Sequence, residues 1–383
     1  MPKIFISLIF IFMAVMQFNP QPCYGKDVSI IWKVTGLNKP SSELLVSPGG
    51  LLCVPSGNKL FMVDANGKKV LEFSCPGGSK DSRPVLGGNG SVFLPGDNSV
   101  QEIKPNGNMG WNFKVQGVNK ATSIISSGPP GLLYLPLPSA LYAIDEQGNY
   151  KWKTAWDSTE INRPWADTKR EIIACAAGAD YLYVVYGEKK SGYTLAAATS
   201  EGEIKWRYRL GTIKSAGLTA LPDGSLYVSS NPGKIDLRTK GKVYLFEKDG
   251  KGKPKWIFSA PFEELTAPTV SEHGNIYFRA AEYLYAVDMD NGKEVWRQKL
   301  LEAKTPPVVD ETKRRIYLGT DDERLLALNP QNRLIWDLKL EGKVVGRPRV
   351  AAGGVLYVVT DKGNLYKIKD EEPDYRKGET NVI

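Results

Sequence analysis

Tryptophan recurs along this chain of 383 residues at an almost constant spacing, and this repeat limits the possible folds more than any other feature. Seven tryptophans and one leucine occupy equivalent segments, at positions 32, 71, 111, 152, 206, 256, 296 and 336. The spacings are 39, 40, 41, 54, 50, 40 and 40 residues. A constant period of roughly 20–50 residues indicates a repeat architecture. The prior of about 150 residues per domain, which would suggest two or three domains, therefore does not apply.

Each repeat contains four short runs that have the character of strands. In one repeat they are residues 267–270, 275–278, 283–288 and the segment around Trp296. The runs alternate with a period of two and end in Gly, Asp and Asn, which is typical of strands joined by tight turns. No window has convincing helical periodicity. Four antiparallel strands in about 40 residues predict a propeller blade.

The number of repeats predicts how the ring closes. After Trp336 the chain supplies three more runs, near 347–350, 355–359 and 364–368, and the missing outer strand is the first one, 29–34. We therefore predict an all-β, eight-bladed β-propeller of four-stranded antiparallel blades, closed by the N-terminal strand. Closure leaves no set of strands unpaired. The outer tryptophans are expected to fill the wedges between blades, and they are Trp32, Trp111, Trp152, Trp206, Trp256, Trp296 and Trp336.

The segment 284–296, Leu-Tyr-Ala-Val-Asp-Met-Asp-Asn-Gly-Lys-Glu-Val-Trp, resembles the repeat of the PQQ-type (quinoprotein-like) propeller family. Looser copies occur at 141–152 and 325–336, and the resemblance covers nearly all of residues 29–370. It implies the propeller fold but not one function, because the family holds quinoprotein dehydrogenases as well as cofactor-free propellers such as BamB-like proteins. The chain is nearest in style to the non-enzymatic members.

The resemblance leaves an enzyme as the alternative, a PQQ- and calcium-dependent dehydrogenase that oxidises an alcohol or a sugar. The chain lacks the adjacent Cys-Cys pair typical of those enzymes, and it is far shorter than they are. The acidic pairs 263–264 and 321–322 could in principle bind calcium through oxygen ligands, but solvated loop charges are the favoured explanation. The one histidine, His273, argues against a zinc site or a Ser-His-Asp triad. We therefore expect no catalytic residue, no metal site and no cofactor.

The N-terminus has the pattern of a secretory signal. Lys3 precedes an apolar stretch, 4–16, which is too short for the roughly 20 residues that span a bilayer, and a small-x-small end follows at 23–25. We predict a signal peptide at 1–25, one propeller domain at 26–370 and a polar C-terminal tail at 371–383. The mature chain would be exported to the periplasm, the cell surface or the extracellular space, without a transmembrane span. Cleavage and retention of the signal both remain open.

The mature charge and the cysteines add two expectations. Removing 1–25 leaves 49 basic and 42 acidic residues, a net charge of +7, which favours anionic partners without requiring them. No arginine-rich tract with interleaved aromatic residues suggests nucleic-acid binding. Cys53, Cys75 and Cys175 are expected to be buried and unpaired, because Cys53 and Cys75 would lie two strands apart.

The residues at the start of the innermost strand of each blade form one column when the repeats are aligned. Because the innermost strands line the central channel, this column would surround one of its mouths. Its charged members are Glu43, Arg83, Arg163 and Arg347. Two guanidinium groups beside one carboxylate would form a funnel for a carboxylate or a phosphate. The alternative is that Glu43 neutralises its neighbours in a structural network.

The spacings of 54 and 50 residues mark two enlarged blades. Their insertions form a second candidate surface, a basic lip of Lys189, Lys190, Lys234, Arg238, Lys240 and Lys242. Insertions in repeat proteins often lie on the binding face, although tolerated surface loops are the simpler alternative. We therefore expect a monomeric, non-catalytic binding or scaffold protein. Its partner would be an envelope protein or an anionic wall, lipid or polysaccharide component.

Overall fold

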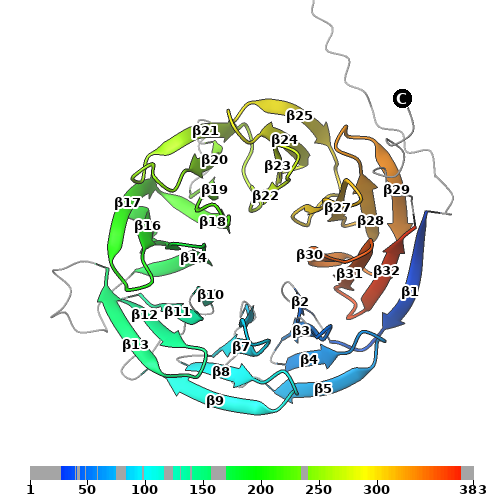
Figure 1. Cartoon of the computed structure of the whole chain (residues 1–383). Helices are drawn as coiled ribbons and strands as arrows, with labels where there is room; N and C mark the ends of the chain where they lie inside the picture. The colour runs from blue at the N-terminus through cyan, green and yellow to red at the C-terminus, as the bar shows by residue number, and fades with distance from the viewer. Residues whose placement is uncertain are drawn as a thin grey trace, which may run out of the picture.

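The computed structural model contains a ring of eight four-stranded antiparallel sheets around a central opening (Figure 1). It describes residues 27–38, 40, 44–47, 49–57, 59–74, 83–96, 99–115, 124–129, 131–138, 140–156, 170–233 and 240–371. All 32 elements of these residues are strands. The described part of the chain contains no helix long and apolar enough to cross a membrane.

The blades follow the chain in order, and the first strand of each lies nearest the centre. Blades 1 to 4 are β2 (Leu45–Val46), β3 (Leu52–Ser56), β4 (Lys59–Val63) and β5 (Lys69–Ser74); β6 (Val85–Leu86), β7 (Val92–Pro95), β8 (Ser99–Ile103) and β9 (Met109–Lys114); β10 (Ser126–Gly128), β11 (Leu132–Pro136), β12 (Ala140–Asp145) and β13 (Tyr150–Ala155); and β14 (Glu171–Ala177), β15 (Leu182–Glu188), β16 (Gly192–Ala198) and β17 (Ile204–Gly211).

Blades 5 to 8 complete the ring. They are β18 (Ile213–Ala220), β19 (Leu226–Pro232), β20 (Gly241–Phe246) and β21 (Pro254–Ala260); β22 (Thr269–Val270), β23 (Asn275–Ala280), β24 (Tyr283–Asp288) and β25 (Glu294–Lys299); β26 (Val308–Asp310), β27 (Arg315–Gly319), β28 (Arg324–Leu328) and β29 (Leu334–Lys339); and β30 (Val344–Ala351), β31 (Val355–Thr360), β32 (Leu365–Asp370) and β1 (Val28–Val34).

The N-terminal strand closes the ring. β1 pairs antiparallel with β32, from Val28 opposite Asp370 to Val34 opposite Leu365. The eight-bladed all-β fold that the sequence predicts is therefore confirmed. The boundaries of the signal peptide and of the tail stay predictions, because residues 1–26 and 372–383 lie outside the described part.

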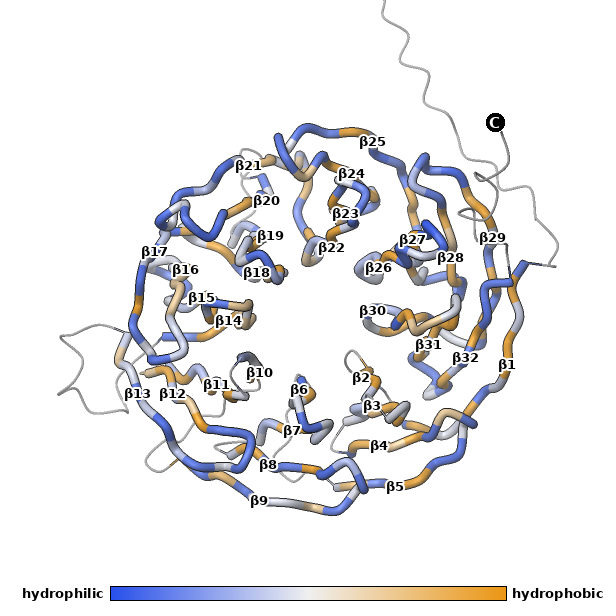
Figure 2. The backbone as a smooth tube through the Cα atoms, viewed as in Figure 1, coloured by the Kyte–Doolittle hydropathy of each residue, from blue (hydrophilic) through white to orange (hydrophobic). Residues whose placement is uncertain are grey.

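Burial explains why the strands differ in sequence. The middle strands are covered on both faces by neighbouring blades, so β11 is buried along its whole length. The outer strands alternate instead, as β21 does, because only one face meets the next blade. Figure 2 shows this alternation of hydrophilic and hydrophobic residues along the outer strands. The described core comprises eight hydrophobic clusters, one at each interface between blades.

The repeated tryptophans share one geometry. Each indole packs on an aromatic ring from the second strand of its own blade, as Trp152 does on Tyr134, with ring centroids 6.1 Å apart. Five indole N–H groups also donate to a turn of the next blade at 2.7–3.1 Å; the pairs are Trp32 with Ala65, Trp111 with Glu146, Trp152 with Ser200, Trp256 with Met289 and Trp296 with Pro330. The indole nitrogens of Trp206 and Trp336 have no acceptor among the described residues.

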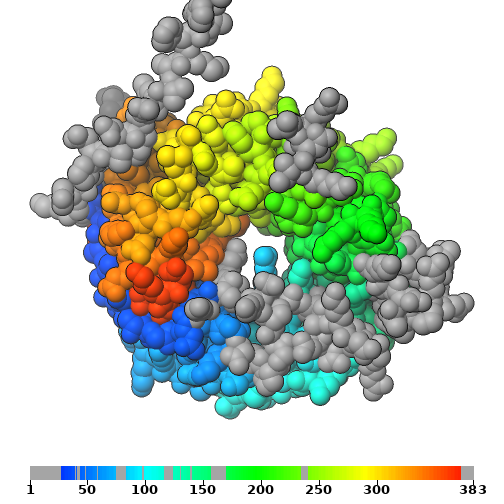
Figure 3. All heavy atoms as spheres, turned by 180° about the vertical axis from the view of Figure 1, so that it is seen from behind, coloured from blue at the N-terminus to red at the C-terminus, as the bar shows by residue number. Residues whose placement is uncertain are grey.

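The meander defines two faces of the ring. The loop face carries the connections between second and third strands, such as 189–191, and the connections between blades. The turn face carries the connections between first and second and between third and fourth strands, such as Asp145–Gly148. Side chains leave the central opening unfilled, as Figure 3 shows from behind.

The two described cysteines are unpaired, as expected. Cys53 is fully buried, and burial raises the pKa of its thiol to about 12. Cys175 differs from the expectation, because it lies on the innermost strand of blade 4 and is only partly buried. Cys75 lies outside the described residues.

Candidate functional site

At the predicted channel mouth, the structure places two of the four charged residues. Arg83 is exposed just before β6, and Arg347 is half-buried within β30. Glu43 and Arg163 lie outside the described residues, so their contacts with the arginines remain predictions. The Nη2 atom of Arg347 donates to the carbonyl oxygen of Ala267 at 3.4 Å. Ala267 belongs to blade 6. This arginine of blade 8 therefore extends past blade 7 to the blade beyond it.

Arg349 is a channel residue that the sequence reasoning missed. Its Nε atom donates to the carbonyl oxygen of Leu44 at 2.8 Å, which joins blade 8 to blade 1 beside Glu43. The Arg-Pro-Arg segment at 347–349 was a possible signal, because it places a second arginine on the same innermost strand. The contacts shown for both arginines are with backbone carbonyls of other blades.

The basic lip lies on the loop face of blades 4 and 5. Lys189 is 3.6 Å from the carboxylate of Glu171, which also accepts a hydrogen bond from Tyr193. Lys190, Lys240 and Lys242 are exposed, and none of them has an ion-pair partner within the described residues. Lys234 and Arg238 lie outside that part. The described lip therefore presents three lysines whose charge no nearby carboxylate neutralises.

The same face is neutralised on blades 7 and 8. Asp321 lies 3.6 Å from Lys304, and Glu323 lies 2.9 Å from Lys362 and 3.4 Å from Lys339. Hydrogen bonds from these two lysines lower the pKa of Glu323, against a smaller opposing effect of burial. Of the acidic pair 321–322, Asp321 thus lies in ion pairs with lysines, and Asp322 lies 3.3 Å from Arg324. No group of three or more His, Cys, Asp and Glu that could hold a metal ion occurs in the described ranges.

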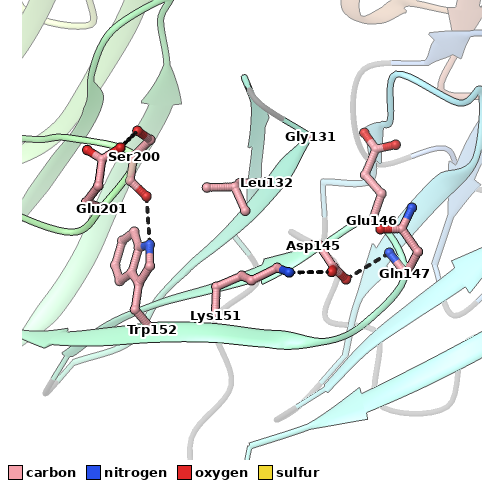
Figure 4. A pocket seen from close by; sticks show the side chains of 9 residues that line it. All are labelled: Gly131, Leu132, Asp145, Glu146, Gln147, Lys151, Trp152, Ser200 and Glu201. Atoms are coloured by element: carbon pink, nitrogen blue, oxygen red, sulfur yellow. Dashed lines mark hydrogen bonds and ion pairs between the residues drawn. The ribbon is translucent and has the colours of Figure 1, made fainter.

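A cavity of about 570 Å³ lies on the turn face between blades 3 and 4 (Figure 4). The sequence reasoning did not anticipate it. Its walls are the β10–β11 and β12–β13 turns, the start of β13 and the β16–β17 turn; the lining residues are Gly131, Leu132, Asp145, Glu146, Gln147, Lys151, Trp152, Ser200 and Glu201. We call this cavity the interblade pocket.

One side of the interblade pocket is apolar and held in place. Leu132 points into the space between Trp152 and Asp145 (Figure 4). The Trp152 indole nitrogen donates to the Ser200 carbonyl at 2.7 Å, and the ring packs against Gly202, which has a φ of +85°. A side chain at Gly202 would overlap the indole, so the turn requires glycine for both its conformation and the packing.

The other side of the pocket is charged. Asp145 accepts hydrogen bonds from the backbone of Gln147 and Asn149, from the Asn149 amide and from Lys151 at 2.8–3.1 Å. Burial acts to raise the pKa of Asp145, but the hydrogen bonds from Lys151 and Asn149 outweigh it and hold that pKa at about 2. Hydrogen bonds from Ser200 and Thr199 also lower the pKa of Glu201. Three carboxylates and one ammonium group leave the lining with a net charge of −2.

Comparison with protein families decides where the chain belongs. The family model described as outer membrane protein assembly factor BamB matches residues 25–258 and 280–373. The chain belongs to the BamB family. A search of the curated proteins finds no match.

Solved propellers resemble this BamB-family chain in fold at low sequence identity. BamB from Moraxella catarrhalis has a TM-score of 0.65 and 11% identity, covering 89% of this chain and 99% of its own. The Dos1 propeller has a TM-score of 0.71 and 11% identity over 89% and 95%. The Pan2 WD40 domain from Neurospora crassa has a TM-score of 0.57 and 10% identity over 92% and 98%. These likenesses support the fold alone.

Proposed function

We propose that this BamB-family propeller is an exported, non-catalytic binding protein that recognises an acidic surface of an envelope protein through the basic lip. One observation carries the proposal. On the loop face, the lysines of blades 7 and 8 are paired with carboxylates, whereas Lys190, Lys240 and Lys242 on blades 4 and 5 have no such partner among the described residues. Unneutralised cations on one side of a ring steer an anionic partner to that side.

The family supports the kind of partner. Members of the matching family are named for outer membrane protein assembly, a role that consists of contacts with other proteins. The net charge of +7 and the predicted signal at 1–25 agree with an anionic partner outside the cytoplasm. Export itself remains part of the proposal.

A charge-reversal experiment tests the lip. Lys190, Lys240 and Lys242 are each replaced by Glu in one variant, and the native envelope is cross-linked and searched for captured proteins. The matched control replaces Lys104, Lys253 and Lys293 by Glu, because these exposed lysines of the turn face change the net charge equally. We expect the lip variant to lose an acidic envelope protein that the control retains. Equal capture by both variants would refute the proposal, and capture of anionic lipid or polysaccharide alone would refute the choice of a protein partner.

The proposal also assigns no cofactor. Mixing the purified protein with PQQ and calcium should leave its visible spectrum unchanged and give no dye-linked oxidation of alcohols or sugars. A bound chromophore with turnover would replace the binding role by that of a quinoprotein dehydrogenase.

A further inference from the structure

The interblade pocket borders a turn whose second residue is shorter than its counterparts in the two adjoining blades. The four-residue turns Asp145–Gly148, Thr199–Gly202 and Glu247–Gly250 are each closed by a hydrogen bond between their first carbonyl and last amide. Their second residues are Glu146, Ser200 and Lys248. Each is the second residue of its turn, although the hairpin of blade 5 is two residues longer than those of blades 3 and 4.

On either side of the pocket, the second residue extends across the interface to the preceding blade. Glu146 accepts hydrogen bonds from the backbone of Gly88 at 2.7 Å and Asn89 at 3.3 Å, in the β6–β7 turn of blade 2. Lys248 lies 2.9 Å from the carboxylate of Asp180, in the β14–β15 turn of blade 4. In both cases a long charged side chain joins a turn of one blade to the first turn of the blade before it.

Ser200 is too short to make the equivalent contact between blades 3 and 4. Its hydroxyl donates to the carboxylate of Glu201 on its own turn, at 2.6 Å. The cavity of about 570 Å³ lies beside this turn, with no side chain crossing it from Ser200. The turn of blade 3 that borders it contributes Gly131, which has no side chain to fill it.

The chemistry of the open space favours a cation with an apolar stem. Leu132 and Trp152 form an apolar wall, and long basic side chains place their methylene groups on such walls while the charged end stays with polar groups. Asp145 is already saturated by four donors. The hydrogen bonds given for the Glu201 carboxylate among the described residues come from its own turn, from Ser200 and Thr199. Glu146 accepts two from blade 2, out of about four lone-pair sites.

We propose that the interblade pocket binds the side chain of an arginine from an extended segment of a partner protein. The guanidinium carries five donors in a rigid plane, which suits bidentate contact with the Glu201 carboxylate on blade 4. An ammonium group would make fewer of these contacts. The site lies on the turn face and is negatively charged, so it is independent of the basic lip, and either can fail without the other.

The test follows the Trp152 indole in the full-length exported protein labelled with ¹⁵N-tryptophan. The probes are acetyl-Gly-Arg-Gly-amide and its neutral counterpart with norleucine. We expect the arginine peptide to shift the Trp152 indole signal saturably, and the norleucine peptide to bind at least about tenfold more weakly, the factor that corresponds to 1.4 kcal/mol. The signal is assigned with Trp152→Phe.

Two variants and one control complete the design. Ser200→Lys should abolish the shift, because it supplies the internal ammonium that Lys248 provides one interface later. Glu201→Gln should weaken binding about tenfold, the size expected for one charge-assisted hydrogen bond. Glu203→Gln changes the same turn outside the pocket lining and should leave binding unchanged. Absence of a saturable shift, equal binding of the norleucine peptide, or full binding by Ser200→Lys would each overturn the proposal.

Discussion

The junction where the ring closes buries a carboxylate that should control its stability. The aspartates Asp64 and Asp288 accept backbone hydrogen bonds within the turn that follows them. Asp370 lies one position further along its repeat, where Met289 stands in blade 6, since the amides of both donate to the glycine before the second strand. No turn follows it in blade 8, because β1 supplies the outer strand. Its side chain is fully buried, accepts a 2.7 Å hydrogen bond from the Tyr317 hydroxyl and lies 3.8 Å from Arg315 Nε. Burial, and then the charge of Asp370, raise the pKa of Tyr317.

Tyr317→Phe removes this donor and keeps the ring that packs on Trp336. A hydrogen bond to a charged group contributes about 1.5–3 kcal/mol. An unfolding entropy of about 2.1 cal/mol/K per residue gives about 0.7 kcal/mol/K for the whole ring, so each kcal/mol lowers Tm by about 1.4 °C. The expected decrease is therefore about 2–4 °C. Asp370→Asn leaves the buried Arg315 without its charge partner and should cost about 3–5 kcal/mol.

Calorimetry and hydrogen exchange together test the reasoning. The double variant should show a coupling of at least about 1 kcal/mol, because the two side chains share one interaction. Exchange of the β1 amides should increase more than exchange of the β17 amides, since Val28 of β1 pairs with Asp370 and β17 belongs to blade 4, away from this junction. A Tm within 1 °C of the unmodified protein for Tyr317→Phe, or equal acceleration in both strands, would refute the role assigned to this junction.

Three further outcomes are expected. The pKa of Asp145 is depressed to about 2, so its ionised form contributes on the order of 2 kcal/mol to the free energy of unfolding. This contribution is complete above pH 4 and is lost as the pH falls towards 2. In Asp145→Asn, thermal unfolding from pH 5 to 2.5 should therefore show a smaller loss of stability. Gly148 has a φ of +83° and lies against the Trp111 ring, so Gly148→Ala should destabilise by more than about 1 kcal/mol in chemical denaturation, and an unchanged midpoint would contradict this. Leu71 packs against Gly107 where other blades place Trp against Gly, so Leu71→Trp should raise Tm by about 1 °C, and a decrease would show that this wedge cannot hold an indole.

The sequence could predict the ring because ring closure depends on a count. The chain has eight outer strands at regular spacing, and its last three strands lack an outer strand of their own. Only the N-terminal strand, Val28–Val34, can complete that last blade, and it does so. The basic lip could also be read from spacing, since insertions appear as longer repeats. The interblade pocket could not be predicted from spacing. It depends on which side chain crosses an interface, and the repeat pattern identifies Glu146, Ser200 and Lys248 alike as turn residues.

The junction and the pocket arise from the same property of a repeat protein. The backbone requires a turn and a large apolar side chain at the interfaces between blades, so those residues report the fold and say little about function. Asp370 differs from its counterparts because β1 replaces the turn that would follow it, and the fold explains it. Ser200 is short, as are Ala65 and Pro105 at the same turn position, and its turn borders the interblade pocket. The lining of that pocket is not set by the repeat, so it is where a ligand should be sought.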